Sequence, residues 1–275
     1  MRLAPFAALL AVATTASLAF LLLPIVAIFA ELSPGDLRDG LKSEVTRDAL
    51  RVTAETNLVA MALIILFGTP TAYLLATRRF RGKALLVTLV ELPLVLPPAV
   101  AGIGLLAAFG RLGLLGGTLD GLGIDIAFTK IAVVLAVTFV ASPFYVRTAI
   151  AAFEAVDSDL VSASRTLGAG PGRTFARVAL PLAGGGLGAG AALAFARGLG
   201  EFGATIMFAG SLQGVTQTLS LAVYQEFDVE FDNALAIGAL LVVASALILL
   251  TAKLVLAWRR SNSTLITVSA PSASS

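Results

Sequence analysis

The chain carries 25 consecutive residues without a charge, from Phe6 to Ala30, and this run limits what the protein can fold into. A helix of roughly 20 mostly apolar residues crosses the hydrocarbon core of a bilayer. The apolar region of a cleaved signal peptide is shorter, about 7–15 residues, so we expect a retained membrane helix although Arg2 supplies a basic start. With 58% hydrophobic and 13% charged residues, the whole chain is too apolar for the surface of a water-soluble domain.

Five further apolar stretches follow the first, and together they predict an all-α, polytopic membrane protein of about six transmembrane helices. The expected spans are residues 6–30, 56–76, 84–109, 126–146, 182–208 and 233–256. The hydrophilic segment 31–53 suits a short surface helix or a loop. Residues 1–258 therefore form one transmembrane domain, and the Ser-rich tail 259–275 is expected to be disordered.

Six spans place both termini on the same side of the membrane, and the basic residues indicate which side. Cytoplasmic loops of membrane proteins carry an excess of Lys and Arg. If the termini are inside, the inner segments hold twelve basic residues and the outer segments hold six: Arg38, Lys42, Arg47, Arg51, Arg111 and Lys130. We therefore expect a multi-pass protein of a bacterial inner membrane with both termini in the cytoplasm, surrounded by lipid.

The composition also excludes several kinds of function. The chain has no Cys and no His, which removes thiol nucleophiles, disulfides and the usual zinc and haem ligands. It has no GxxxxGK[ST] phosphate loop, so ATP hydrolysis cannot be assigned to it. Nucleic-acid binding is not indicated either, because no stretch combines clustered basic residues with a polar fold. We expect no catalytic residue, no metal site and no cofactor bound by this chain itself.

The connection between the fourth and fifth expected spans, about residues 154–181, differs from every other loop. Asp157 or Ser158 can cap a short helix that runs through Leu167, and Gly168 can end it. Pro171 can then open the next helix. The small residues 162–164 would give this helix a flat surface against which another protein could pack. From the residues alone, a docking helix and an ordinary amphipathic interfacial helix remain equally open.

This segment resembles the cytoplasmic signature of ABC importer permeases, which reads E-A-A, three residues, Gly, nine residues, Ile, one residue, Leu-Pro. Here residues 162–164 read Ser-Ala-Ser, Gly168 follows after three residues, and Val178, Ala179, Leu180 and Pro181 come nine residues later. Ser162 replaces the acid of the signature, which puts in doubt any salt bridge at that place. The resemblance implies a coupling helix that docks into an ATPase subunit through Ser162, Ala163, Ser164, Arg165, Leu167, Gly168, Leu180 and Pro181.

Three other stretches are similar to molybdate permeases of that family. They are residues 91–102 (ELPLVLPPAVAG), 199–204 (LGEFGA) and 216–224 (TQTLSLAVY). Sulfate and thiosulfate permeases share much of this pattern. The resemblance implies a fold like that of type I ABC importer permeases, a homodimeric pore, and a separate cytoplasmic ATPase subunit that uses ATP and Mg. It also implies an external oxyanion-binding protein. The substrate would be a tetrahedral oxyanion, molybdate before tungstate or sulfate.

Polar and helix-breaking residues inside the expected spans are the candidates for a translocation pathway or gate. Pro97 and Pro98 interrupt the third span, and freed carbonyls at membrane depth must face protein or water. A kink that only helps packing is an equally open interpretation. The glycines of residues 184–190 are better explained by close helix packing.

Arg197 and Glu201 lie four residues apart and therefore share one face of the fifth span. An isolated charge at membrane depth costs at least about 2.5–3.5 kcal/mol. The pair could line the pathway, with Arg197 attracting an oxyanion, or could form a salt bridge that holds the bundle together. Thr216, Gln217 and Thr218 in the outer connection could form an outer gate or contact a delivery protein.

Two other classes of protein stay open at this point. A secondary transporter could use Glu91, Arg197 and Glu201 as an ion relay, and its transport would need a membrane potential but no ATP. A membrane-embedded enzyme fits less well, because the chain has no His or Cys and no tight cluster of acids within its spans.

Overall fold

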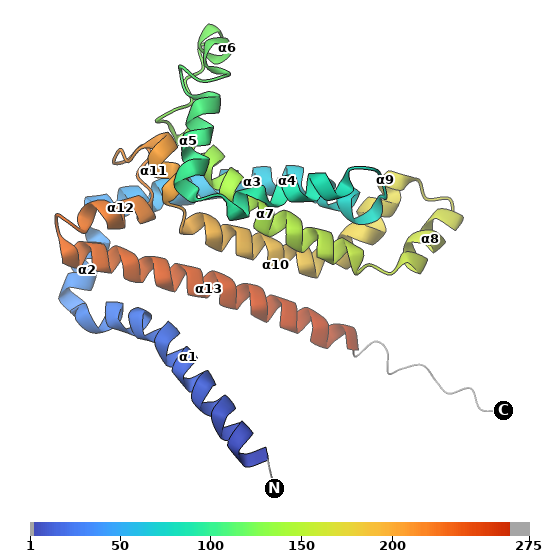
Figure 1. Ribbon diagram of the computed structural model, residues 1–275, viewed down its shortest axis with the longest axis horizontal. Coiled ribbons are helices and arrows are strands. Elements are labelled where there is room, and N and C mark those ends of the chain that lie inside the picture. Colours follow the sequence, from blue (N-terminus) through green and yellow to red (C-terminus); the bar gives the residue numbers. More distant parts are fainter. Residues whose placement is uncertain (1–2, 265–275) are drawn as a thin grey trace.

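Helices make up the protein throughout the part that its computed structural model describes, residues 3–264, and no strand occurs there (Figure 1). In chain order the elements are α1 (Leu3–Glu31), α2 (Pro34–Lys42), α3 (Glu44–Thr77), α4 (Lys83–Val95), α5 (Pro98–Phe109), α6 (Gly116–Gly121), α7 (Lys130–Glu154), α8 (Ser158–Thr166), α9 (Pro171–Thr174), the π-helical turn η1 (Phe175–Ala179), α10 (Leu180–Leu199), α11 (Gly203–Ala209), α12 (Leu219–Glu226) and α13 (Phe231–Thr264). Within the described residues, five helices are long and apolar enough to span a membrane, or six if the bent pair α4 and α5 counts as one span. The expected all-helical membrane fold is confirmed.

The centre of the bundle is α7, which packs along both α3 and α10. Local caps fix where two of these helices begin: the Ser43 hydroxyl accepts the N–H of Thr46 (3.1 Å), and the Thr129 hydroxyl accepts the N–H of Ile131 (3.2 Å). On α10, Gly190 lies so near Thr148 that an added Cβ would be 3.0 Å from the Thr148 Cβ. The glycines of this span thus permit close helix packing, as small residues do in membranes.

The third and fifth expected spans are not continuous helices. The interruption of the third is the one predicted from its prolines, and its two helices together cover the expected range 84–109, whereas the break in the fifth corrects the predicted range 182–208. The third is divided at Leu96 and Pro97 into α4 and α5, which meet at an angle of 113°. Proline at the first position of α5 lacks the N–H that would continue α4. The fifth ends as α10 at Leu199, and residues 203–209 form the separate helix α11.

Smaller corrections concern the helix ends. The outer segment 31–53 holds α2 and also the first turns of α3, which begins at Glu44 rather than near Thr56. The fourth span is α7, which begins at Lys130 and continues to Glu154. α13 continues through Thr264, so residues 259–264 of the tail expected to be disordered are helical. The rest of that tail lies outside the described residues.

Two parts of the fold extend away from the bundle. None of the apolar stretch of α1 is buried, and the helix diverges from its neighbour α13 (Figure 1). α5 and α6 project from the side of the bundle. The α8–α9 segment lies at the same end as the C-terminal part of α13, and α2 and α12 lie at the opposite end.

Candidate functional site: the coupling segment and the broken helices

α8 is a short helix with both ends fixed by local hydrogen bonds. The Asp157 carboxylate accepts the N–H of Asp159 (2.8 Å) at its start. At its end, Gly168 has a φ of +84°, its N–H donates to the Arg165 carbonyl (2.9 Å), and the N–H of Ala169 donates to the Ser164 carbonyl (3.0 Å). This is the Schellman arrangement, in which a left-handed residue, usually glycine, closes the helix. The local helix that the sequence predicts is therefore present.

α8 faces outward with its small and apolar residues. Ser162, Ala163 and Arg165 are exposed, and the Leu167 side chain is 88% exposed. Ser164 turns the other way: its hydroxyl lies 3.0 Å from the hydroxyl of the buried Thr174 on α9. Of the residues expected to dock a partner, Ser164 therefore braces α8 against α9 instead of facing outward.

The segment that follows α8 and α9 is anchored to the bundle by an aromatic cluster that the sequence did not predict. The Phe175 ring in η1 lies 4.7 Å from the Tyr73 ring of α3 and 6.2 Å from the Phe153 ring of α7, between centroids. Leu180 packs beside these rings in a hydrophobic cluster, whereas Pro181 is exposed. Such aromatic pairs contribute about 0.5–1.5 kcal/mol beyond the area they bury. A displacement of α8 would therefore be transmitted to α3 and α7.

The two broken spans meet at their breaks. An added Cβ on Gly203 of α11 would lie 2.7 Å from the Pro98 Cβ of α5, and one on Gly102 would lie 2.6 Å from the Ala204 carbonyl oxygen. Only glycine at both places allows this approach. The prolines of the third span thus position α5 against α11.

Arg197 and Glu201 join the end of α10 to the start of α11. An Arg197 guanidinium nitrogen lies 2.7 Å from Glu201 Oε2, and Glu201 Oε1 accepts the N–H of Ala204 (2.7 Å). Glu201 is 1% exposed and the Arg197 side chain is 27% exposed. Oε2 lacks an aligned hydrogen-bond donor among the described residues, so the contact with Arg197 is an ion pair. The Glu201 carboxylate therefore fixes the backbone where the helix breaks at Gly200. The Arg197 guanidinium that pairs with it remains partly exposed.

Thr216, Gln217 and Thr218 are all buried, which corrects the expectation that they could contact a delivery protein. The Thr216 hydroxyl accepts the N–H of Leu212 (3.0 Å), and the Gln217 amide donates to the Gln225 side chain. In this conformation their side chains are not on the surface that a partner would touch.

A set of buried polar residues near these three also escaped the sequence analysis. The Thr53 hydroxyl of α3 accepts the N–H of Leu219 (2.8 Å), and the Asn57 amide donates to the Thr53 carbonyl (3.1 Å). Polar atoms of Asn57, Thr205 and Thr218 have no hydrogen-bond partner among the described residues. A signal existed in the polar residues at positions 53, 56 and 57, which lie on one face of α3.

Glu91, Arg197 and Glu201, which a secondary transporter could use as an ion relay, do not form one cluster. Glu91 lies 3.4 Å from Arg147, near the end of α7 that carries α8, and Arg197 and Glu201 are at the opposite end of α10. Among the described residues, no group of three or more acidic side chains is close enough together to hold a metal ion.

Comparison with known proteins identifies the family. Residues 64–260 match the family model of the binding-protein-dependent transport system inner membrane component. The chain is 45% identical over 235 residues to the molybdenum transport system permease protein ModB of Mycobacterium tuberculosis, covering 86% of this chain and 89% of that protein. It is 36% identical over 235 residues to the sulfate transport system permease protein CysT of Escherichia coli, covering 83% and 84%.

Solved structures agree with the fold. The chain superposes with a TM-score of 0.68 on a chain of a bacterial alginate ABC transporter in complex with an alginate pentasaccharide-bound periplasmic protein. The match covers 90% of this chain and 92% of that one at 18% identity. From the family match and the close relatives together, the chain belongs to the inner-membrane permease components of binding-protein-dependent ABC importers.

Proposed function

We propose that this chain forms the membrane pore of an ATP-driven importer of molybdate. The observation that carries the proposal is the 45% identity to a molybdenum permease over 86% of the chain, against 36% to a sulfate permease over a similar length. ATP hydrolysis, with its Mg, takes place in a separate subunit. An external binding protein delivers the oxyanion, in keeping with the periplasmic protein named in the solved alginate transporter complex.

Two copies of the chain enclose the pore in this proposal. In support, α1 buries none of its apolar stretch within one copy, and a helix that hydrophobic must face lipid or another protein. Both termini lie in the cytoplasm, because the basic residues concentrate in the segments on that side. α8 then lies at the cytoplasmic end of the bundle, where an ATPase subunit can reach it (Figure 1).

The ATPase subunit docks on the exposed surface of α8, which consists of Ser162, Ala163, Arg165 and Leu167. Closure of the ATPase dimer moves α8, and the aromatic cluster of Tyr73, Phe153 and Phe175 passes this movement to the ends of α3 and α7. A rigid-body movement of packed helices can open a pore in this way. The breaks at Pro97 and Gly200 are the points at which α5 can change its angle to α4, and α11 its angle to α10.

Arg197 is the residue that meets the oxyanion. Its guanidinium carries five N–H donors and pairs with a single carboxylate, so donors remain for a tetrahedral anion. Glu201 keeps the arginine in place and limits how tightly the anion is held. Thr216, Gln217 and Thr218 belong to the closed outer gate, since all three are buried in this conformation.

Uptake of labelled molybdate tests the proposed function. Cells that lack their own molybdate importer receive this permease together with an ATPase subunit and a molybdate-binding protein from the same organism. We expect uptake that stops on ATP depletion, and that excess tungstate suppresses more strongly than excess sulfate. Strong inhibition by sulfate at equal concentration would assign the chain to the sulfate importers. Uptake that persists without ATP but needs a membrane potential would indicate a secondary transporter.

A further inference from the structure

Two charged residues stand at the same level on the neighbouring helices α3 and α7. Glu55 is the last charge of α3 before the uncharged stretch 56–77, and Lys130 opens α7 before the uncharged stretch 131–146. Uncharged stretches of about this length cross the hydrocarbon core, and charged residues at their ends lie among the lipid headgroups. Glu55 and Lys130 therefore mark the surface of the bilayer on this side of the bundle.

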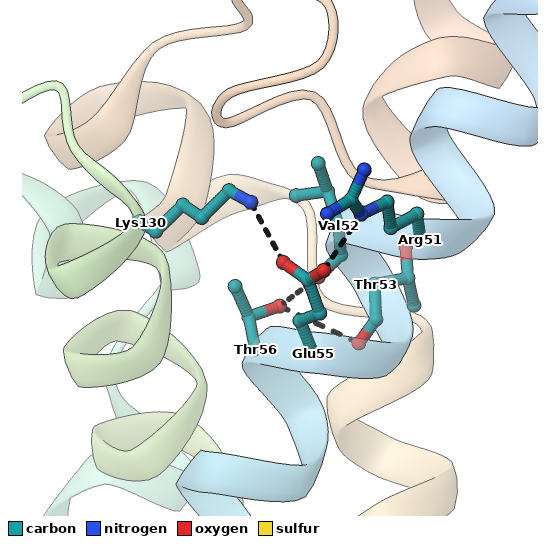
Figure 2. A network of polar contacts seen from close by, with 6 residues as sticks. All are labelled: Arg51, Val52, Thr53, Glu55, Thr56 and Lys130. Carbon is teal, nitrogen blue, oxygen red and sulfur yellow. Dashed lines mark hydrogen bonds and ion pairs between the residues drawn. The ribbon is translucent and has the colours of Figure 1, made fainter.

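Glu55 is shared by two cations. Its Oε1 accepts the Arg51 Nε–H (2.8 Å), and its Oε2 accepts an N–H of Lys130 (2.7 Å), as Figure 2 shows. One carboxylate thus faces two positive charges, so Arg51, Glu55 and Lys130 together carry one excess positive charge. Asp48, one turn earlier on α3, also acts on Arg51 and accepts a hydrogen bond from Gln213 (3.1 Å). The Arg51 side chain is 76% exposed, and its terminal nitrogens make no hydrogen bond to the described residues. N–H donors of both cations are free to bind an anion while Glu55 stays paired.

An apolar groove of about 420 Å³ leads from this charged group along α3 and α7. Its walls are Val59 and Leu63 on α3 and Ile131, Val134 and Leu135 on α7, with Glu55, Thr56 and Lys130 at its charged end. The Thr56 hydroxyl does not need a hydrogen-bond acceptor from a molecule in the groove, because it already donates to the Val52 carbonyl (2.7 Å). The groove therefore has a cationic end among the headgroups and an apolar wall that descends into the bilayer.

We propose that this groove is a binding site for an anionic glycerophospholipid. The phosphate of the headgroup pairs with Arg51 and Lys130, and one acyl chain lies along Val59, Leu63 and Val134. The free N–H donors of Arg51 and Lys130 favour an anionic headgroup over a zwitterionic one, since Arg and Lys bind phosphate through charge-assisted hydrogen bonds. A helix of another protein would cover the apolar wall but would leave the two cations without an anion. The inference depends on the membrane location of the chain and not on its substrate.

Photocrosslinking tests the site on the full-length permease in nanodiscs. The probes are phosphatidylglycerol and phosphatidylcholine, each with a diazirine near the middle of one acyl chain, and labelled peptides are identified by mass spectrometry. We expect phosphatidylglycerol to label residues 59–63 and 131–135 severalfold more than phosphatidylcholine does. This comparison needs no variant, so equal labelling by the two lipids in the wild-type protein would overturn the proposal.

Two test variants and one control variant sharpen the test. Val59→Trp fills the groove and should reduce labelling of residues 131–135 severalfold, whereas Leu66→Trp, on an exposed part of α3 outside the groove, should leave it unchanged. Lys130→Gln should bring the labelling by phosphatidylglycerol down to that by phosphatidylcholine. Unchanged labelling of residues 131–135 in Val59→Trp would show that no lipid occupies the groove.

Discussion

The Cβ atom of Pro98 would lie only 2.7 Å from a Cβ atom placed on Gly203, although the two residues belong to different broken spans. Neither Pro98 Cβ nor the backbone around it can yield easily, because Pro98 is the first residue of α5 and its φ is fixed by the ring. The contact locks the two breaks of the pore subunit together. It also makes one glycine more sensitive to substitution than its neighbour in the same sequence motif.

Gly203→Ala is therefore expected to destabilise the permease by about 1–3 kcal/mol, the usual cost of overpacking. Gly200→Ala is the matched control, since an added Cβ there meets no atom within 4 Å. Thermal unfolding in detergent, followed by size-exclusion chromatography, gives the comparison. Equal stability of the two variants would mean that α5 and α11 are not in the contact described above.

Arg197→Ala should remove uptake and also lower stability, because it leaves the Glu201 carboxylate buried without its cation. Breaking a buried pair in this way costs about 3–5 kcal/mol. The double variant Arg197→Ala with Glu201→Gln removes both charges and keeps an oxygen that can accept the N–H of Ala204. We expect it to regain most of the stability but not the uptake of molybdate.

The double variant thus separates the two roles of the pair. Recovery of both stability and uptake would show that the pair is structural only, and that the oxyanion does not depend on Arg197. Stability is measured by thermal unfolding of the purified protein, and uptake by labelled molybdate in cells.

Leu167→Asp should weaken binding of the ATPase subunit about tenfold or more. An exposed leucine that becomes buried in a docking surface contributes about 1.5–3 kcal/mol, and a tenfold change corresponds to 1.4 kcal/mol. Leu41→Asp on α2, at the opposite end of the bundle, is the control. Co-purification of the ATPase subunit with each variant gives the measurement, and equal recovery with both would place the dock elsewhere.

Gly168→Ala should destabilise the C-terminal end of α8 and leave the packing of the other helices unchanged. With a φ of +84°, alanine at this position is strained by about 1–2 kcal/mol. Gly170→Ala, two residues further on, has a φ of −67° and open space, so it should have little effect. Hydrogen exchange of residues 158–169 should rise in Gly168→Ala alone, together with a loss of ATP-driven uptake. Exchange that rises equally in both variants would contradict the role given to Gly168.

Part of this fold could be predicted because its signals are local. The uncharged run 6–30 and the other apolar stretches follow from composition, and the bounds of α8 follow from Asp157, Gly168 and Pro171. The family resemblance was carried by the spacing from Gly168 to Leu180-Pro181, and the match over residues 64–260 bears it out. The three stretches that resemble molybdate permeases are likewise consistent with the 45% identity to ModB.

The site was harder to predict because its geometry depends on contacts between distant segments. The prolines of the third span predict an interruption but not the angle of 113° between α4 and α5. Packing of α11 against α5 helps to set that angle. Thr216, Gln217 and Thr218 look like exposed loop residues, yet all three are buried, beside the point where the N–H of Leu219 binds Thr53 of α3. The inward orientation of Ser164 likewise depends on Thr174.

The sequence by itself determined that this chain is a membrane protein, and where the short helix α8 begins and turns. These properties depend on hydrophobic length, on caps and on the φ angle of single residues, all of which act within a few positions. Only the tertiary structure decided that Arg197 is paired with a buried carboxylate, that Gly203 meets Pro98 and that Glu55 is shared between Arg51 and Lys130. Burial and pairing depend on what packs against a residue, and in this bundle the neighbour across α3, α5 or α7 comes from a distant part of the chain.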